Sequence, residues 1–137
     1  MRGTIQVRRD VIAAMRSEAE REPRQECCGL LAGRDSAITA IYPAANGAAN
    51  PATSYELAPR DLFRIMREIR AAKLELLGIY HSHPTVDNYP SPRDIERAFY
   101  ADAAYFILSP QPDAPKSVRA FSICDVKVTE LEIQALD

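Results

Sequence analysis

The chain has 137 residues, of which 47% are hydrophobic and 26% are charged, and its formal net charge is −2. These values are typical of a globular protein of one domain, so we expect residues 1–137 to form a single domain. The acidic balance excludes nucleic-acid binding by bulk electrostatics. No apolar run approaches the roughly 18 residues of a membrane span, and no apolar signal segment follows Met1, so we expect no membrane partner.

The three cysteines, Cys27, Cys28 and Cys124, argue against a disulfide framework. Their number is odd, and neighbours on a strand face opposite ways. Their spacing does not match a structural zinc knuckle. We therefore expect a reducing, cytoplasmic location, and the sequence assigns the cysteines no role.

The chain opens with a predicted strand and helix. Polar and apolar residues alternate over residues 4–7, as they do in a strand with one buried face. Asp10 is placed to cap a helix that Pro23 ends. One helix face is apolar, at positions i, i+4 and i+8: Val11, Met15 and Ala19.

An apolar hairpin is predicted next. Residues 26–33 read as a compact strand that ends at a glycine, and residues 37–42 read as its antiparallel partner across a turn. Residues 43–51 form a loop with turn chemistry. Asn46, Asn50 and Tyr55 lie in or just after this loop, where a structural role is favoured over a place in a substrate groove.

A second helix is predicted from Pro59, since proline is tolerated in a first helical turn. Its apolar stripe comprises Leu62, Ile65, Met66 and Ile69. The opposite side carries a row of arginines, which we interpret as a solvated face rather than a site for an acidic partner: Arg60, Arg64, Arg67 and Arg70.

The only two histidines of the chain, His81 and His83, lie in a predicted buried strand over residues 76–83. Side chains at i and i+2 of a strand point to the same face. Two converging imidazoles supply two thirds of a catalytic zinc site, which usually takes three protein ligands.

A loop over residues 84–90 leads to a third predicted helix, with Ser91 at N-cap, Pro92 at N1 and Asp94 at N3. Its apolar side is predicted to comprise Ile95, Ala98 and Phe99. Asp94 can swing back over the strand end as a third ligand, and the first turn of a helix favours its charge. Ordinary helix capping explains the same residue equally simply.

Three further strands are predicted over residues 104–108, 118–124 and 126–133, the last two forming a terminal hairpin. Helices interspersed with six or seven strands indicate an α/β domain with a mixed central sheet and flanking helices.

A zinc hydrolase also needs a proton acceptor for water, and the candidates are Glu26, Glu56, Glu75 and Asp87. Glu26 stands out because it directly precedes an apolar strand, although it can simply mark the exposed start of that strand. Cys28 is a weak candidate nucleophile, because apolar surroundings raise a thiol pKa.

These residues resemble a known family. His81-Ser82-His83, seven residues and then Ser91-x-x-Asp94 match the zinc motif of the JAMM (MPN+, JAB-domain) metalloproteases, and residues 26–33 look like the family's glutamate-bearing strand. The resemblance covers nearly the whole chain and implies the JAMM/MPN, cytidine-deaminase-like architecture.

The resemblance also implies roles. His81, His83 and Asp94 would bind one Zn²⁺ per chain. Glu26 would take the proton from the zinc-bound water and pass it to the leaving amine, and Ser91 would help to hold the oxyanion.

The substrate class follows from the resemblance alone. Small stand-alone members resemble prokaryotic enzymes that cleave the amide bond after the C-terminal glycine tail of a ubiquitin-like or sulfur-carrier protein. A non-catalytic MPN-type scaffold and a zinc amidase or peptidase of other specificity stay open as alternatives. The carrier, the leaving group and the oligomeric state, a homo-oligomer included, also stay open.

Overall fold

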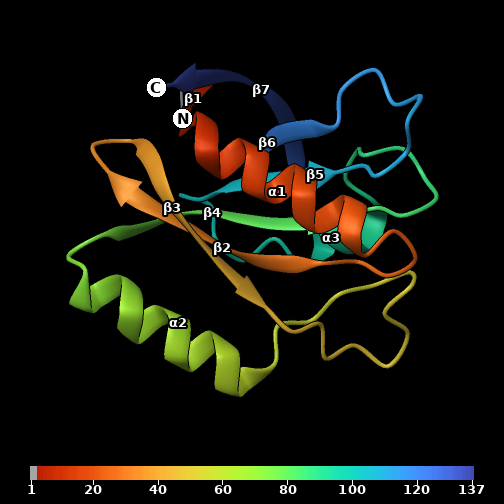
Figure 1. Cartoon of the computed structure of the whole chain (residues 1–137), viewed down its shortest axis with the longest axis horizontal. Helices are drawn as coiled ribbons and strands as arrows, with labels where there is room; N and C mark the ends of the chain where they lie inside the picture. The colour runs from red at the N-terminus through yellow and green to blue at the C-terminus, as the bar shows by residue number, and fades with distance from the viewer. Residues whose placement is uncertain (1–2) are drawn as a thin grey trace.

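The computed structural model describes residues 3–137, and over these residues helices are interspersed among the strands (Figure 1). Its elements are β1 (Thr4–Arg8), α1 (Arg9–Arg21), β2 (Cys28–Arg34), β3 (Ala37–Ala44), α2 (Pro59–Ala71), β4 (Glu75–Ser82), α3 (Pro92–Glu96), β5 (Ala104–Leu108), β6 (Val118–Cys124) and β7 (Lys127–Leu136). None of the described helices is long and apolar enough to cross a membrane.

The strands form one mixed sheet in the order β1-β3-β2-β4-β5-β6-β7, which closes through β1. β1 runs parallel to β7 and to β3, and β4 runs parallel to β5, whereas the other neighbours are antiparallel. The predicted α/β class and mixed sheet are confirmed. Closure into a barrel was not part of the prediction.

The two long helices pack on opposite faces of the sheet. Neighbouring strand residues point to opposite faces, so alternate residues of one strand contact different helices. Leu31 of β2 joins the core cluster that contains the apolar face of α1. Leu30 and Ala32 join the cluster that contains Ile65 and Ile69 of α2. Figure 1 shows α1 and α2 on different sides of the β2–β4 region.

β4 lies in the middle of the sheet, between β2 and β5. At its C-terminal end His81 pairs with Cys28 of β2 and with Ile107 of β5. His83 follows the last strand residue, and its backbone N–H donates to Leu108 O at 2.9 Å. The end of β4 is therefore fixed from both sides.

Two details of the predicted helices are wrong. Asp10 does not cap α1, because the helix begins one residue earlier and Asp10 instead accepts hydrogen bonds from Arg8. Phe99 does not lie on an apolar helix face, because α3 ends at Glu96, and the Phe99 side chain is 78% exposed.

Gly29 allows β2 to approach its neighbours closely. A Cβ added there would lie 2.5 Å from the backbone oxygen of Tyr42 and 2.5 Å from the buried ring of Tyr80. Backbone cannot yield as a flexible side chain does, so even a methyl group overfills this position.

We predict that Gly29→Ala lowers the free energy of unfolding by about 1–3 kcal/mol, measured by urea denaturation. The matched control is Gly47→Ala, whose added Cβ would meet nothing closer than 3.5 Å. That variant should keep or slightly raise the stability. Equal stabilities of the two variants would contradict the close approach.

Candidate metal centre

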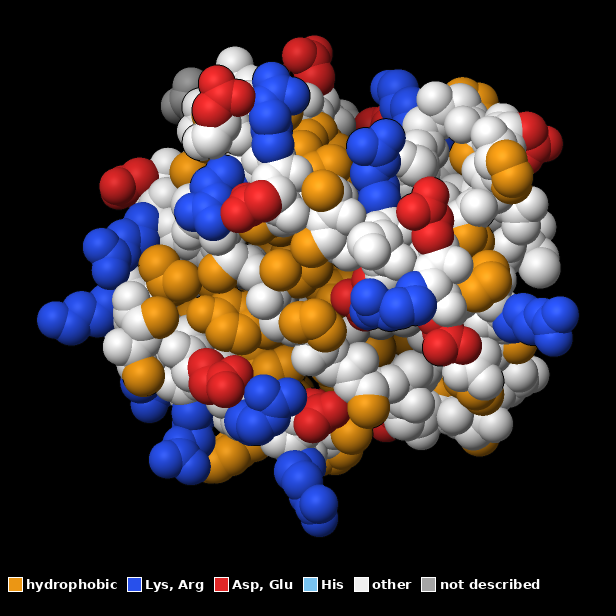
Figure 2. All heavy atoms as spheres, in the orientation of Figure 1, with side chains coloured by type: hydrophobic (Ala, Val, Ile, Leu, Met, Phe, Trp, Pro, Cys, Tyr) orange, Lys and Arg blue, Asp and Glu red, His pale blue; other side chains and the backbone are white. Residues whose placement is uncertain are grey.

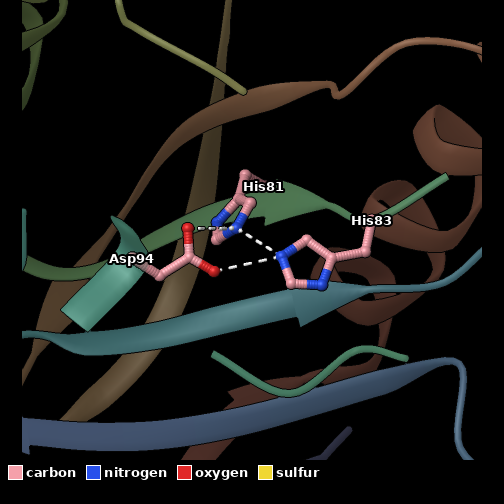
Figure 3. A group of neighbouring side chains, drawn as sticks. All are labelled: His81, His83 and Asp94. Atoms are coloured by element: carbon pink, nitrogen blue, oxygen red, sulfur yellow. Dashed lines mark hydrogen bonds and ion pairs between the residues drawn. The ribbon is translucent and has the colours of Figure 1, made fainter. Parts of the chain in front are cut away.

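Three side chains converge at the C-terminal end of β4 (Figure 3). His81 Nε2 and His83 Nε2 lie 3.2 Å apart. His81 Nε2 lies 3.2 Å from Asp94 Oδ1, and His83 Nε2 lies 3.0 Å from Asp94 Oδ2. Both histidines are buried, and the Asp94 side chain is only 12% exposed.

These distances fit a tetrahedral metal ion. With zinc–ligand bonds of about 2.0–2.1 Å, neighbouring ligand atoms lie about 3.3 Å apart. The observed separations of 3.0–3.2 Å are close to that value. Two imidazole nitrogens and a carboxylate also form a donor set that zinc accepts readily.

The first turn of α3 fixes Asp94. Its backbone N–H donates to Ser91 Oγ at 3.1 Å, and the Ser91 N–H donates to Asp94 Oδ2 at 2.9 Å, which completes a capping box. Burial alone would raise the pKa of Asp94, but the bonds to His81 and His83 outweigh it and hold the pKa well below its usual range. Asp94 is therefore ionised and able to coordinate a metal ion.

Different neighbours hold the two imidazole rings. His83 Nδ1 lies 2.7 Å from the backbone oxygen of Asp87, which can only accept, so Nδ1 carries the proton and Nε2 is free to coordinate. His81 Nδ1 is buried without a partner among residues 3–137. The His81 ring instead stacks on Tyr55, with centroids 4.2 Å apart and planes 18° apart.

Burial affects the charge of the two rings differently. It lowers the pKa of His81, so this imidazole is neutral and able to coordinate. Burial acts in the same direction on His83, but hydrogen bonds to Asp94 and to the Asp87 backbone outweigh it and raise the pKa of His83. A metal ion at this site would thus compete with a proton on His83.

Glu26 is buried two residues before β2. Its backbone is fixed twice: its N–H donates to Pro51 O at 2.7 Å, and Asn46 Nδ2 donates to its carbonyl at 2.9 Å. Burial raises the pKa of the Glu26 carboxyl to about 7, and the charges of His83 and Asp94 also act on it. A carboxyl group with this pKa can both accept and donate a proton near neutral pH.

The other candidate bases do not join this cluster. Glu56 and Glu75 are exposed. The Asp87 side chain is 74% exposed and lies 3.7 Å from Arg119, so only the backbone oxygen of this residue reaches the site.

The cysteines do not provide a nucleophile. Burial raises the pKa of Cys27 to about 11 and that of Cys28 to about 12, so both remain thiols at neutral pH. None of the three cysteines forms a disulfide.

The sequence did not indicate every residue around the site. For Tyr55 the sequence favours a structural role over a place in a substrate groove, and its stacking on His81 has no local sequence signal. Asn46 has a structural task, since its Oδ1 also accepts from Ala48 N and Glu56 N and so fixes the loop that supports Glu26.

Comparisons with known proteins find relatives that cover most of this chain. The family described as prokaryotic homologs of the JAB domain matches residues 8–124. A desampylase of Haloferax volcanii is 40% identical over 105 residues, covering 75% of this chain and 76% of the relative. A CysO-cysteine peptidase of Mycobacterium tuberculosis is 30% identical, covering 99% and 96%. A Desulfitobacterium hafniense protein solved in solution superposes with a TM-score of 0.85 at 28% identity, covering 98% and 94%.

The raised pKa of Glu26 predicts a pH-dependent stability of the metal-free protein. Between the ordinary pKa of 4.5 and about 7, the native state binds a proton that the unfolded state has lost. This contribution to the free energy of unfolding therefore falls as the pH rises through that window. Urea denaturation of wild type and Glu26→Gln at pH 5, 6 and 7 should show the variant gaining on wild type as the pH rises. Parallel pH profiles would contradict the raised pKa.

Proposed function

This chain belongs to the family of prokaryotic homologs of the JAB domain, and on that premise we propose that it is a zinc metallopeptidase for ubiquitin-like or sulfur-carrier conjugates. The bond cleaved is the amide that follows the C-terminal glycine tail of the carrier. The observation that carries the proposal is the convergence of His81, His83 and Asp94 at one end of β4. Residues 1–137 act as one catalytic domain, and the free cysteines support a reducing, cytoplasmic location.

Relatives support the reaction type. One is named a desampylase and another a CysO-cysteine peptidase, so both names describe cleaving enzymes. The family membership and the His81-Ser82-His83…Ser91-x-x-Asp94 motif extend this activity to the present chain.

Zinc is the metal that the donor set suits best. His81 and His83 would hold it through Nε2, and Asp94 through its carboxylate, with one ion per chain. When bound, zinc supplies Lewis-acid polarisation of the amide carbonyl and lowers the pKa of water.

Glu26 is the proton carrier in this proposal. It takes a proton from the attacking water and delivers it to the nitrogen of the leaving amine. Its pKa of about 7 suits both halves of that task, because an acid–base group is most effective near the working pH. The bonds that fix its backbone keep the carboxyl group in place without occupying it.

Ser91 stabilises the developing oxyanion. Its Oγ accepts the Asp94 N–H, so the hydroxyl proton stays free to be donated. A hydroxyl held by a helix cap is oriented before the reaction, which is what an oxyanion donor requires.

An open strand edge supports a thin, extended substrate. β3 pairs with β1 only at Ala37 and Ile38, so residues 40–44 have β2 as their one strand neighbour. Ala44 at this edge pairs with Cys28 of β2, and Cys28 pairs in turn with His81 of β4. The edge and the proposed metal ligands therefore lie at the same level of the sheet. A glycine tail can add to such an edge through main-chain hydrogen bonds. In Figure 2, apolar side chains gather between α1 and α2, over the strands that Figure 1 shows there.

The direct test uses zinc-loaded protein and three substrates: a carrier–amino acid adduct, a carrier joined to a lysine side chain, and simple dipeptides. We expect cleavage after the glycine tail and complete loss of activity when a chelator removes the metal.

Glu26→Gln should keep one zinc per chain and lose at least about 10²-fold in kcat, whereas His81→Ala and Asp94→Asn should lose zinc as well. Cleavage of dipeptides alone would contradict the substrate class, and a wild type that takes up no zinc would favour a scaffold.

Ser91→Ala should lower kcat by about 10²–10³-fold while zinc remains bound, because one oxyanion donor is lost. Ser91→Thr is the matched control, since it keeps both the hydroxyl group and a capping oxygen. The kcat of Ser91→Thr should remain within about tenfold of the wild-type kcat. A Ser91→Ala enzyme with wild-type kcat would refute the oxyanion role.

A further inference from the structure

Asn88 is a buried side chain in the loop between β4 and α3, with only 2% of its surface exposed. Its Nδ2 donates to Ile107 O in β5 at 3.2 Å and to Lys116 O in the β5–β6 connection at 2.9 Å. An amide buried this deeply, with both donors used, holds the backbone that carries it.

The peptide bond that precedes Asn88 carries the acceptor for His83. The carbonyl of Asp87 lies 2.7 Å from His83 Nδ1, on the side of the ring away from Asp94. His83 itself is tied to the end of β5 through the bond from its N–H to Leu108 O. Both hydrogen-bonding partners are therefore attached to the end of β5. The backbone of His83 bonds to Leu108, and the peptide that carries the Asp87 carbonyl is attached through the side chain of Asn88 to Ile107.

The other contacts of this loop do not reach the Asp87 carbonyl, including the edge-on packing of Tyr89 against Phe121, with ring centroids 5.4 Å apart. Gln111 Nε2 donates to Pro84 O, at the far end of the loop from Asp87. The Asp87 side chain is mostly exposed, and its 3.7 Å contact with Arg119 is open to solvent. An exposed pair of this kind contributes little, so Asn88 is the main anchor of the Asp87 carbonyl.

We propose that Asn88 is a positioning residue of the metal centre: it fixes the Asp87 carbonyl, which fixes the tautomer and orientation of His83. This inference rests on the metal role proposed for His83. It concerns one ligand only, because His81 Nδ1 has no acceptor among the described residues and its ring is held by Tyr55. Outer partners of this kind typically change metal affinity by about 10–100-fold when they are lost.

The test compares three variants by chelator competition for Zn²⁺. Asn88→Ala, which loses both donors, should bind zinc about 10–100-fold more weakly than wild type. Asn88→Ser, which keeps one donor, should have a zinc affinity between those of wild type and Asn88→Ala. It replaces Asn88→Ala in the comparison if that variant does not fold. Val86→Ala is the matched control in the same loop: it shortens an uncharged side chain that is 62% exposed, so its zinc affinity should equal that of wild type.

A second readout uses the metal-free protein. The Nδ1 proton of His83 should give a slowly exchanging imidazole signal by NMR in wild type and in Val86→Ala, and lose that protection when Asn88 is changed. A lower Tm with unchanged zinc affinity and an unchanged Nδ1 signal would mean a merely structural role and would overturn the inference. Failure of wild type itself to bind zinc would instead overturn the proposed function, and this inference with it.

Discussion

The carboxylate of Asp94 lies buried between two imidazole rings, and most of the site serves to keep it ionised there. A buried anion is costly unless it is paired and hydrogen-bonded. The rings of His81 and His83 and the Ser91 N–H supply those bonds. One shared proton cannot satisfy two imidazole nitrogens and a carboxylate at 3.0–3.2 Å as fully as one divalent cation can. The cluster is therefore able to hold a metal ion, and its hydrogen bonds raise the pKa of His83 in spite of burial.

Three separate parts of the chain meet this requirement. The middle strand of the sheet ends at the histidines, the capping box of α3 returns Asp94 to them, and the segment before β2 brings Glu26 alongside. His81 and Asp94 lie on regular elements and His83 directly follows β4, whereas loops supply the supports: Asn46 and Pro51 hold Glu26, and Asn88 holds the acceptor of His83. A site built in this way keeps its geometry without a bound substrate, which electrostatic catalysis requires.

Local patterns predicted most of the elements, since strands and helices differ in the period of their apolar residues, although the predicted cap of α1 was wrong. The capping box at Ser91 and Asp94 is the clearest case, because both partners lie within four residues. The closure of the sheet and the surroundings of the site depend instead on contacts between segments that are distant in the sequence. Nothing local shows that β1 closes the sheet or that Tyr55 stacks on His81. The residues alone favoured an exposed strand start for Glu26, whereas the structure buries it beside the loop around Asn46 and Pro51. The family resemblance was needed to assign its role.

The most direct test of the metal centre is X-ray absorption spectroscopy at the zinc edge on the stoichiometrically loaded protein. If His81, His83 and Asp94 hold the zinc, the spectrum will show only nitrogen and oxygen neighbours, at about 2.0–2.1 Å, with the multiple scattering of two imidazole rings. A sulfur scatterer at about 2.3 Å would place the metal on Cys27 or Cys28 and contradict the assignment of His81, His83 and Asp94 as its ligands.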